Sequence, residues 1–127
     1  MANALGGAVS MDPRWMEFDF GHWEGRAWHD LPRAEIDAWA NDLVSARPPG
    51  GEALEDVALR ATAVFEHWLD REPERLIVVA HGGVIRVVLA HVLGLPLANC
   101  MKLQVDYGSI SEVEITESRR VVRYVNH

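Results

Sequence analysis

The stretch Leu76-Ile-Val-Val-Ala-His-Gly-Gly-Val-Ile-Arg86 decides the fold. Its first five residues are apolar and four of them are branched, which is typical of a strand buried on both faces in a parallel sheet. Two glycines follow, and then an apolar run from Val84 to Leu93 that is long enough for a buried helix. Gly94 and Pro96 mark the end of this helix. The sequence therefore predicts a strand, a sharp glycine turn and a helix.

This order of elements places His81 at the carboxyl end of a strand, where open α/β sheets bind their ligands. The two glycines allow the backbone to approach a ligand closely, and the free N–H groups of a new helix favour an anion. The residues thus indicate a phosphate site. A histidine that merely caps the end of a strand explains the same residues, and both interpretations stay open at this point.

Length, charge and cysteine content restrict the class of function. A chain of 127 residues corresponds to a single domain, expected over residues 1–127. The formal net charge of −7 argues against a nucleic-acid partner or an anionic membrane surface. The single cysteine, Cys100, fits a reducing cytoplasm. Because the sequence contains neither a signal-peptide pattern nor an apolar run long enough to cross a membrane, we expect a soluble, cytoplasmic protein.

Helical spacing of apolar residues predicts two further helices. The first begins with Asp30 as its N-cap and Pro32 in its first turn. Its apolar face consists of Ile36, Trp39, Ala40, Leu43 and Val44. The second begins near Glu52 and Glu55 and ends before Pro73. Its buried stripe consists of Leu54, Val57, Ala58, Ala61, Val64, Phe65, Trp68 and Leu69.

The remaining segments are shorter. Residues 2–6 are compatible with the end of a helix, and residues 8–11 with a short strand. Residues 97–103 predict a short helix, and residues 107–125 a β-hairpin in which Glu112 and Glu114 face arginines. The order of these elements indicates an α/β fold with a partly parallel sheet.

Between the first strand and the first helix lies an aromatic segment, Trp15 to Trp28, with neither helical nor strand periodicity. We expect an ordered loop packed by its own aromatic rings. Such loops often carry function because a rigid scaffold positions them. Most of the rings are explained by packing alone, but packing does not explain why Glu17 and Glu24 lie among them.

Five blocks of residues follow one another in a familiar order: Glu17-x-Asp19-Phe-Gly21-x-Trp-Glu-Gly25, Trp39, Pro49-Gly-Gly-Glu52 with Arg60, His81-Gly-Gly-x-x-Arg86, and Tyr107-Gly-Ser109. Their order and spacing resemble the histidine phosphatase superfamily, which has the phosphoglycerate mutase-like fold. The likeness begins at Ala8 and is greatest to the α-ribazole phosphatase branch, which serves the cobalamin lower-ligand pathway. It implies a three-layer α/β/α fold with a mostly parallel sheet and a C-terminal hairpin.

The resemblance also implies roles for individual residues. Glu17 matches the general acid that protonates the leaving oxygen. His81 matches the second histidine, which donates hydrogen bonds to the transferring phosphoryl group. Gly82 contributes a backbone N–H to substrate binding, and Trp23 and Glu24 belong to the same substrate-binding set. We expect Glu24 also to support the loop. The family's substrates are small phosphorylated molecules, and we expect no cofactor and no metal.

Two groups on which the family's reaction depends are not in this sequence. No histidine precedes His22, so the nucleophilic Arg-His-Gly motif is missing, and Arg14 is the only arginine before Glu17. The chain resembles the family with about its first third removed. We therefore expect negligible hydrolysis of phosphomonoesters by this chain alone. Because the missing strand lies beside the His81 strand in the family, we also expect marginal stability or self-association.

Alternative functions remain open on the sequence alone. The chain is a phosphomonoester hydrolase whose activity belongs to a longer form, a catalytically inactive protein that binds a phosphate ligand or a partner, or a phosphoglycerate mutase-like phosphoryl transferase. A metal-dependent hydrolase that uses His22, Glu24 and His29 is a further reading. These three residues do not have the i, i+4 spacing of a helical metal pair.

Overall fold

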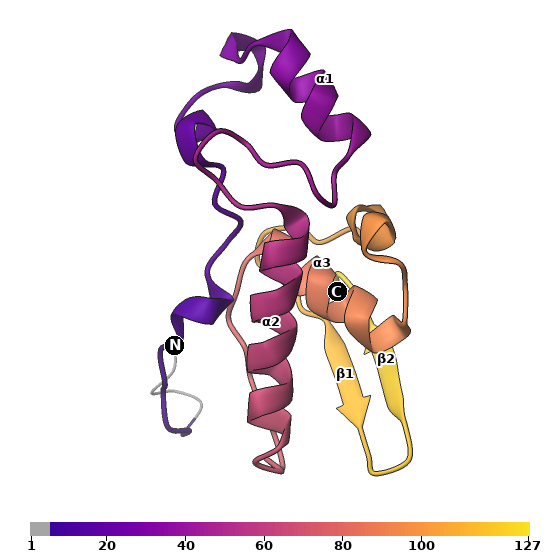
Figure 1. The fold of residues 1–127 in the computed structure, drawn as a ribbon. Coiled ribbons are helices and arrows are strands. Elements are labelled where there is room, and N and C mark those ends of the chain that lie inside the picture. Colours follow the sequence, from indigo (N-terminus) through magenta and orange to yellow (C-terminus); the bar gives the residue numbers. More distant parts are fainter. Residues whose placement is uncertain (1–5) are drawn as a thin grey trace.

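The computed structural model describes residues 6–127, which form three α-helices and a two-stranded sheet. The helices are α1 (Arg33–Asn41), α2 (Leu54–Leu69) and α3 (Gly82–Leu93), and the strands are β1 (Glu112–Ile115) and β2 (Arg120–Tyr124). Figure 1 shows α3 between α2 and the β1–β2 hairpin, while α1 stands apart at the end of the molecule where α2 begins. Short 3₁₀ turns connect these elements.

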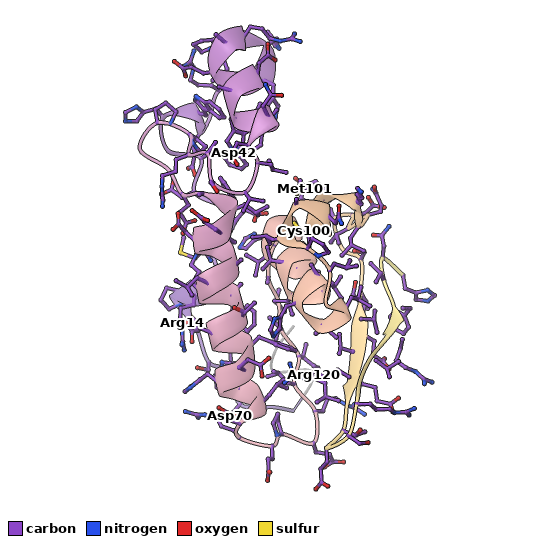
Figure 2. The ribbon with its side chains drawn as sticks, turned by 45° about the vertical axis from the view of Figure 1, so that its right-hand side comes forward. Arg14, Asp42, Asp70, Cys100, Met101 and Arg120 are labelled. Carbon is purple, nitrogen blue, oxygen red and sulfur yellow. The ribbon has the colours of Figure 1, made fainter. Side chains whose placement is uncertain are left out.

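The core forms where α2 packs against α3. Its residues are small or branched, which lets the two helices approach closely: Val57, Ala61, Val84, Val87 and Ala90 are at most 2% exposed. Cys100, in the 3₁₀ helix Leu97–Lys102, closes one end of this core and is buried beside α3 (Figure 2). The predicted helices 54–69 and 84–93 are confirmed, since these apolar stripes are the surfaces that make contact.

Helix α3 begins and ends where the glycines predict. His81 is its N-cap residue in an extended conformation, and Gly82 and Gly83 form the first turn. Gly94 ends the helix in the left-handed region with φ of 65°, where a residue without a Cβ is not strained. The glycine turn therefore fixes the position of His81 relative to the helix.

The predicted strand Leu76–Ala80 is wrong as a buried strand. The segment is extended, but it joins no sheet, and the side chains of Ile77 and Val79 are 55% and 74% exposed. A strand exists only when a neighbour accepts and donates its backbone hydrogen bonds. Among residues 6–127 only β1 and β2 pair, so the parallel part of the predicted sheet is not formed there. The strand predicted over residues 8–11 is likewise unpaired.

Two predictions about the ends of helix α1 are wrong. Asp30 does not cap α1, because it belongs to a 3₁₀ turn, Trp28–Asp30, and Pro32 takes the N-cap position. Leu43 and Val44 lie beyond the end of α1 at Asn41. The helix tail expected over residues 2–6 lies, except for Gly6, outside the described residues.

The C-terminal hairpin is confirmed. β1 and β2 are antiparallel, with Ile115 opposite Arg120 and Glu114 opposite Val121. The Glu114 carboxylate accepts a hydrogen bond from Arg119 at 3.0 Å and lies 3.3 Å from Arg123. Glu112 instead accepts a hydrogen bond from the Tyr124 hydroxyl. In the part of the chain that the structure describes, no helix has the length and apolar character that a membrane crossing requires.

Candidate active site

The first turn of α3 brings together residues that lie far apart in the sequence. The backbone N–H of Gly83 donates a hydrogen bond to Glu17 Oε2 at 3.2 Å. His81 precedes this turn, and its side chain is exposed and bonded to no group in residues 6–127. The carboxylate of Glu17 and the imidazole of His81 therefore belong to the same end of the same helix, although 64 positions (81 − 17) separate them in the sequence.

Glu17 approaches the helix closely at a glycine. A Cβ added to Gly83 would lie 2.5 Å from Glu17 Oε1, so the Glu17 side chain would have to move away from the helix. A Cβ added to Gly82 would lie 3.1 Å from Arg86 Nη1. The two glycines thus allow a carboxylate and a guanidinium to approach the free N–H groups of the first helical turn.

Arg86 lies in α3, about one turn after Gly82. Its Nε donates to the carbonyl of Leu103 at 2.8 Å, which ties α3 to the segment that follows the Leu97–Lys102 turn. Because its Nη1 lies beside Gly82, a positive charge adjoins the N-terminus of α3. An anion at this turn would be favoured by the helix N–H groups and by this guanidinium.

The backbone that carries Glu17 is held by Arg60 of α2. Nη1 of Arg60 donates to the carbonyls of Arg14 and Met16 at 2.9 and 2.7 Å. Nη2 donates to the carbonyl of Glu17 itself at 3.1 Å. The guanidinium therefore fixes the segment immediately before the Glu17 carboxylate.

The orientation of Arg60 depends on Glu52. Nε and Nη2 of Arg60 donate to the two carboxylate oxygens of Glu52, each at 2.9 Å. These hydrogen bonds hold the pKa of Glu52 below its ordinary value, because they stabilise the charged carboxylate. Glu52 also accepts a hydrogen bond from the backbone N–H of Asp19. The family blocks include Glu52 and Arg60, but nothing local in the sequence shows that the two residues meet the aromatic loop.

A cavity of 380 Å³ adjoins Glu17 on the side of the aromatic loop. Its walls include four aromatic rings and two carboxylates, from Phe18, Phe20, Trp23, Trp28, Glu17 and Glu24. The rings support one another edge to face, with 5.8 Å between the centroids of Phe20 and Trp28. Trp28 is 53% exposed, so a large apolar surface of this cavity is accessible. The cavity can hold a flat apolar group next to Glu17.

Comparison with known proteins identifies the family of this chain. A family model described as the histidine phosphatase superfamily (branch 1) matches residues 1–127. The chain belongs to the histidine phosphatase superfamily. The predicted α/β class and phosphoglycerate mutase-like fold are confirmed by the solved structures that it resembles.

Relatives of this histidine phosphatase chain include two kinds of enzyme. It is 28% identical to the adenosylcobalamin/alpha-ribazole phosphatase of Escherichia coli (strain K12), over 93% of this chain and 60% of the relative. It is 32% identical to a probable phosphoglycerate mutase of Cronobacter sakazakii (strain ATCC BAA-894), over 93% of this chain and 57% of the relative.

Solved structures of phosphatases also superpose on this chain. The alpha-ribazole phosphatase from Shigella flexneri superposes with a TM-score of 0.85 and 27% identity, over 94% of this chain and 61% of that protein. A mycobacterial glucosyl-3-phosphoglycerate phosphatase superposes with a TM-score of 0.80 and 30% identity, over 98% of this chain and 66% of that protein. The histidine phosphatase chain thus spans about three-fifths of the length of the first of these proteins.

The structure places the predicted substrate-binding residues of this histidine phosphatase chain in two groups. Gly82 lies in the first turn of α3. Trp23 and Glu24 line the aromatic cavity. Trp23 is 4% exposed, and its Nε1 donates to Glu35 at 3.2 Å, so most of this ring packs inside the loop. Glu24 accepts a hydrogen bond from the backbone N–H of Phe20, which closes the loop on itself.

The close packing of the aromatic loop requires a glycine at position 21. Gly21 has a φ of 55°, and a Cβ there would lie 2.3 Å from the carbonyl of Pro49. The next N–H, of His22, donates to that same carbonyl at 2.8 Å. The predicted ordered loop is therefore anchored on the proline- and glycine-rich turn before α2.

The residues of the metal-site interpretation do not assemble. Glu24 bonds within the loop, and His29 lies 3.4 Å from Asp30. Among residues 6–127, no group of three or more histidine, cysteine, aspartate or glutamate side chains is arranged to hold a metal ion.

Proposed function

We propose that this chain forms the proton-donating and phosphate-stabilising part of a phosphomonoester hydrolase site of the alpha-ribazole phosphatase type. The observation that supports the proposal is the hydrogen bond that the Gly83 N–H donates to Glu17. Gly83 lies two residues after His81, whose imidazole is exposed. A carboxyl group that donates a proton and a histidine that binds a phosphoryl group must lie on either side of one small ligand. Glu17 and His81 both belong to the N-terminal end of α3, which supports a shared ligand between them.

In the proposed reaction, the phosphoryl group lies against the first turn of α3. The N–H of Gly82 and the imidazole of His81 stabilise the negative charge of its oxygens in the transition state, and the Gly83 N–H joins them when the phosphoryl group displaces the Glu17 carboxylate from it. A nucleophile bonds to phosphorus while the bond from phosphorus to the alcohol oxygen breaks, and the carboxyl group of Glu17 gives its proton to that oxygen. The nucleophilic histidine that the family uses has no counterpart among these 127 residues. Turnover therefore belongs to a protein that supplies this group.

The aromatic cavity suggests the class of alcohol. Glu17 lines the cavity and also contacts α3, so an alcohol that leaves beside Glu17 would enter between Phe20 and Trp28. Flat aromatic groups pack well against such rings. Alpha-ribazole phosphate carries a flat aromatic base on its ribose, and its chemistry suits the cavity. The substrate is a small phosphorylated molecule, and a cytoplasmic location is part of the same proposal.

The charges around the cavity disfavour the mutase alternative. Glu17 and Glu24 contribute two carboxylates to the walls, and Arg26, which also lines the cavity, donates a hydrogen bond to the backbone carbonyl of Asp30. A substrate with a second anionic group, such as phosphoglycerate, would bring that charge near two carboxylates, with Arg26 as the one cation of the lining. An uncharged aromatic alcohol avoids this repulsion.

Calorimetric titration of the 127-residue chain tests both parts of the proposal. The ligands are inorganic phosphate, phenyl phosphate and 3-phosphoglycerate. We expect phenyl phosphate to bind more tightly than the other two. His81→Ala should weaken all binding about tenfold, or about 1.4 kcal/mol. Trp28→Ala should reduce phenyl phosphate affinity to that of inorganic phosphate, because it removes the accessible cavity wall.

Matched controls distinguish the two parts. His67 is an exposed histidine on α2, and Trp68 lies on the same helix outside the cavity, so alanine at either position should leave binding unchanged. Phosphate affinity unaffected by His81→Ala would overturn the phosphate site. Equal affinities for phenyl phosphate and 3-phosphoglycerate would overturn only the substrate class.

The alternative of a catalytically inactive, phosphate-binding protein predicts the same binding results. The two proposals differ when the reaction is followed. The hydrolase proposal predicts that a longer form carrying an Arg-His-Gly motif hydrolyses phosphomonoesters and that Glu17→Gln in this form greatly slows turnover. Tight binding by the longer form, without hydrolysis, would favour the inactive alternative.

A further inference from the structure

Arg60 of α2 holds the main chain from which the Glu17 side chain extends. Its mostly buried guanidinium donates hydrogen bonds to three main-chain carbonyls, of Arg14, Met16 and Glu17, at 2.9, 2.7 and 3.1 Å. A guanidinium carries its N–H donors in one rigid plane. Three carbonyls that converge on one such group have little freedom to move. The main chain as far as Glu17 is therefore fixed against α2.

Glu52, in the turn before α2, holds the main chain on the other side of Glu17. Its carboxylate accepts the N–H of Asp19 at 3.0 Å, and its own backbone N–H donates to the carbonyl of Asp19 at 2.9 Å. The same carboxylate accepts two hydrogen bonds from Arg60, each at 2.9 Å. One ion pair thus holds the chain both before and after the loop position that follows Glu17.

The Glu17 carboxylate reaches α3 from this fixed main chain. Its Oε1 accepts the N–H of Phe18 at 2.9 Å, and its Oε2 accepts the N–H of Gly83 at 3.2 Å. Of these two bonds, the second joins the loop to α3. A hydrogen bond of this length is lost when its atoms separate by a further ~1 Å. The contact with α3 therefore depends on where the main chain of Glu17 is held.

We propose that Arg60, oriented by Glu52, is a positioning residue for the proton donor of the site. The inference rests on the proposed function, because the position of Glu17 affects catalysis only if its carboxyl group protonates the leaving oxygen. Arg60 does not line the aromatic cavity, so it acts through Glu17 and not on the substrate. A misplacement of about 1 Å in a reacting group can slow a reaction about 100-fold.

A second ion pair at the start of α2 provides a matched control. Arg47 donates through Nη1 and Nη2 to the two carboxylate oxygens of Asp56. Asp56 also accepts the N–H of Ala53 at 2.8 Å, which caps the helix. In the described part of the chain, neither side chain bonds to residues 14–19. The Arg47 pair thus stabilises the start of the same helix without holding Glu17.

The amide of Gly83 reports the position of the Glu17 carboxylate directly. Gly83 is the second residue of α3, and the first N–H groups of a helix have no partner within it, so Glu17 is what slows its exchange with water. Water-exchange NMR of the ¹⁵N-labelled 127-residue chain measures this rate. We expect Arg60→Lys and Glu17→Ala each to raise it about fivefold, as for one lost hydrogen bond. Glu52→Gln should raise it less.

A double variant separates positioning from a general loss of stability. If Arg60 acts through Glu17, Arg60→Lys should add nothing to the exchange rate of Gly83 once Glu17→Ala has removed the carboxylate. A merely structural role would give two effects that multiply. Arg47→Lys should leave the Gly83 rate unchanged. Circular dichroism establishes that each variant keeps its helices.

The outcomes for Arg60 and for the proposed function are distinguishable. A Gly83 rate unchanged by both Arg60→Lys and Glu52→Gln would overturn the positioning role. A faster rate in the double variant than in Glu17→Ala, or equal acceleration by Arg47→Lys, would overturn it as well. Phosphate titration of the unmodified chain tests the proposed function separately. Expected exchange rates without phosphate binding would refute that function and leave the placement of Glu17 by Arg60 supported.

Discussion

At the residue scale, the carboxylate of Glu17 occupies the position at the first turn of α3 that an anionic ligand would take. Its Oε1 accepts the N–H of Phe18 and its Oε2 that of Gly83, at 2.9 and 3.2 Å. The family motif predicts both Glu17 and His81 from the sequence. Their common position depends on contacts over more than 60 residues, which no local pattern contains.

Glu17→Gln should increase the affinity of this chain for inorganic phosphate. The neutral amide removes a negative charge from the site, and two unit charges about 4 Å apart interact by about 1 kcal/mol in water. We therefore expect binding about fivefold tighter by calorimetry. Glu24→Gln is the control, because the Glu24 carboxylate bonds within the loop and should matter less. Weaker phosphate binding by Glu17→Gln would contradict this arrangement.

Arg60→Lys should destabilise the fold, because lysine keeps the positive charge but not the planar guanidinium group with its several N–H donors. The variant loses the paired hydrogen bonds to Glu52 and those to the carbonyls that precede Glu17. Hydrogen bonds to charged groups in this setting predict a loss of about 2 kcal/mol in the free energy of unfolding. Urea denaturation measures this loss in the free energy of unfolding.

The control for Arg60 is Arg33→Lys. Arg33 bonds Asp37 on the exposed side of α1, where an ion pair contributes less than about 0.5 kcal/mol. Equal losses in the two variants would show that the Arg60 guanidinium has no special role in stability.

At the scale of elements, local sequence predicts what local forces determine. Helices α2 and α3 follow from apolar stripes, and α3 also from its two flanking glycine signals. The hairpin follows from alternation and its turn. The Leu76–Ala80 strand fails because a strand depends on a neighbour that its own sequence does not specify. Asp30 fails as a cap because the aromatic loop extends into a further 3₁₀ turn.

One ionic cluster joins three elements of the fold. Glu66 of α2 accepts two hydrogen bonds from Arg120 of β2, at 2.5 and 2.7 Å, and lies 2.7 Å from His91 Nε2 of α3. Figure 2 shows Arg120 in the space between β2 and α2. These contacts, chiefly the hydrogen bonds from Arg120, lower the pKa of Glu66 from 4.5 to about 2. The charged carboxylate is thus favoured in the folded state.

The cluster predicts a loss of stability in acid. Since the pKa of Glu66 is depressed by folding, its contribution is complete above about pH 4.5 and is lost as the pH falls toward about 2. Glu66→Gln should therefore remove part of the fall in unfolding free energy between these pH values. Glu117→Gln, in the turn of the hairpin, is the control and should leave the profile unchanged. Parallel profiles for Glu66→Gln and the unmodified chain would contradict the prediction.

At the scale of the whole molecule, the chain combines a family fold with an unpaired segment at its centre. Helices, hairpin and loop match solved histidine phosphatases closely, yet the chain spans about three-fifths of their length. The described residues bring Glu17 to the first turn of α3, which carries the proposed proton donor and phosphate site. Only the fold shows that Glu17 meets α3.

The central claim is that one anion binds where His81, the first turn of α3 and Glu17 meet. The most direct measurement is a two-dimensional ¹H–¹⁵N NMR titration of the 127-residue chain with inorganic phosphate. We predict that the largest shifts occur at the backbone amides of Gly82 and Gly83 and that the ring signals of His81 move with the same affinity. Shifts centred elsewhere, or no saturable shift at these two glycines, would contradict the claim.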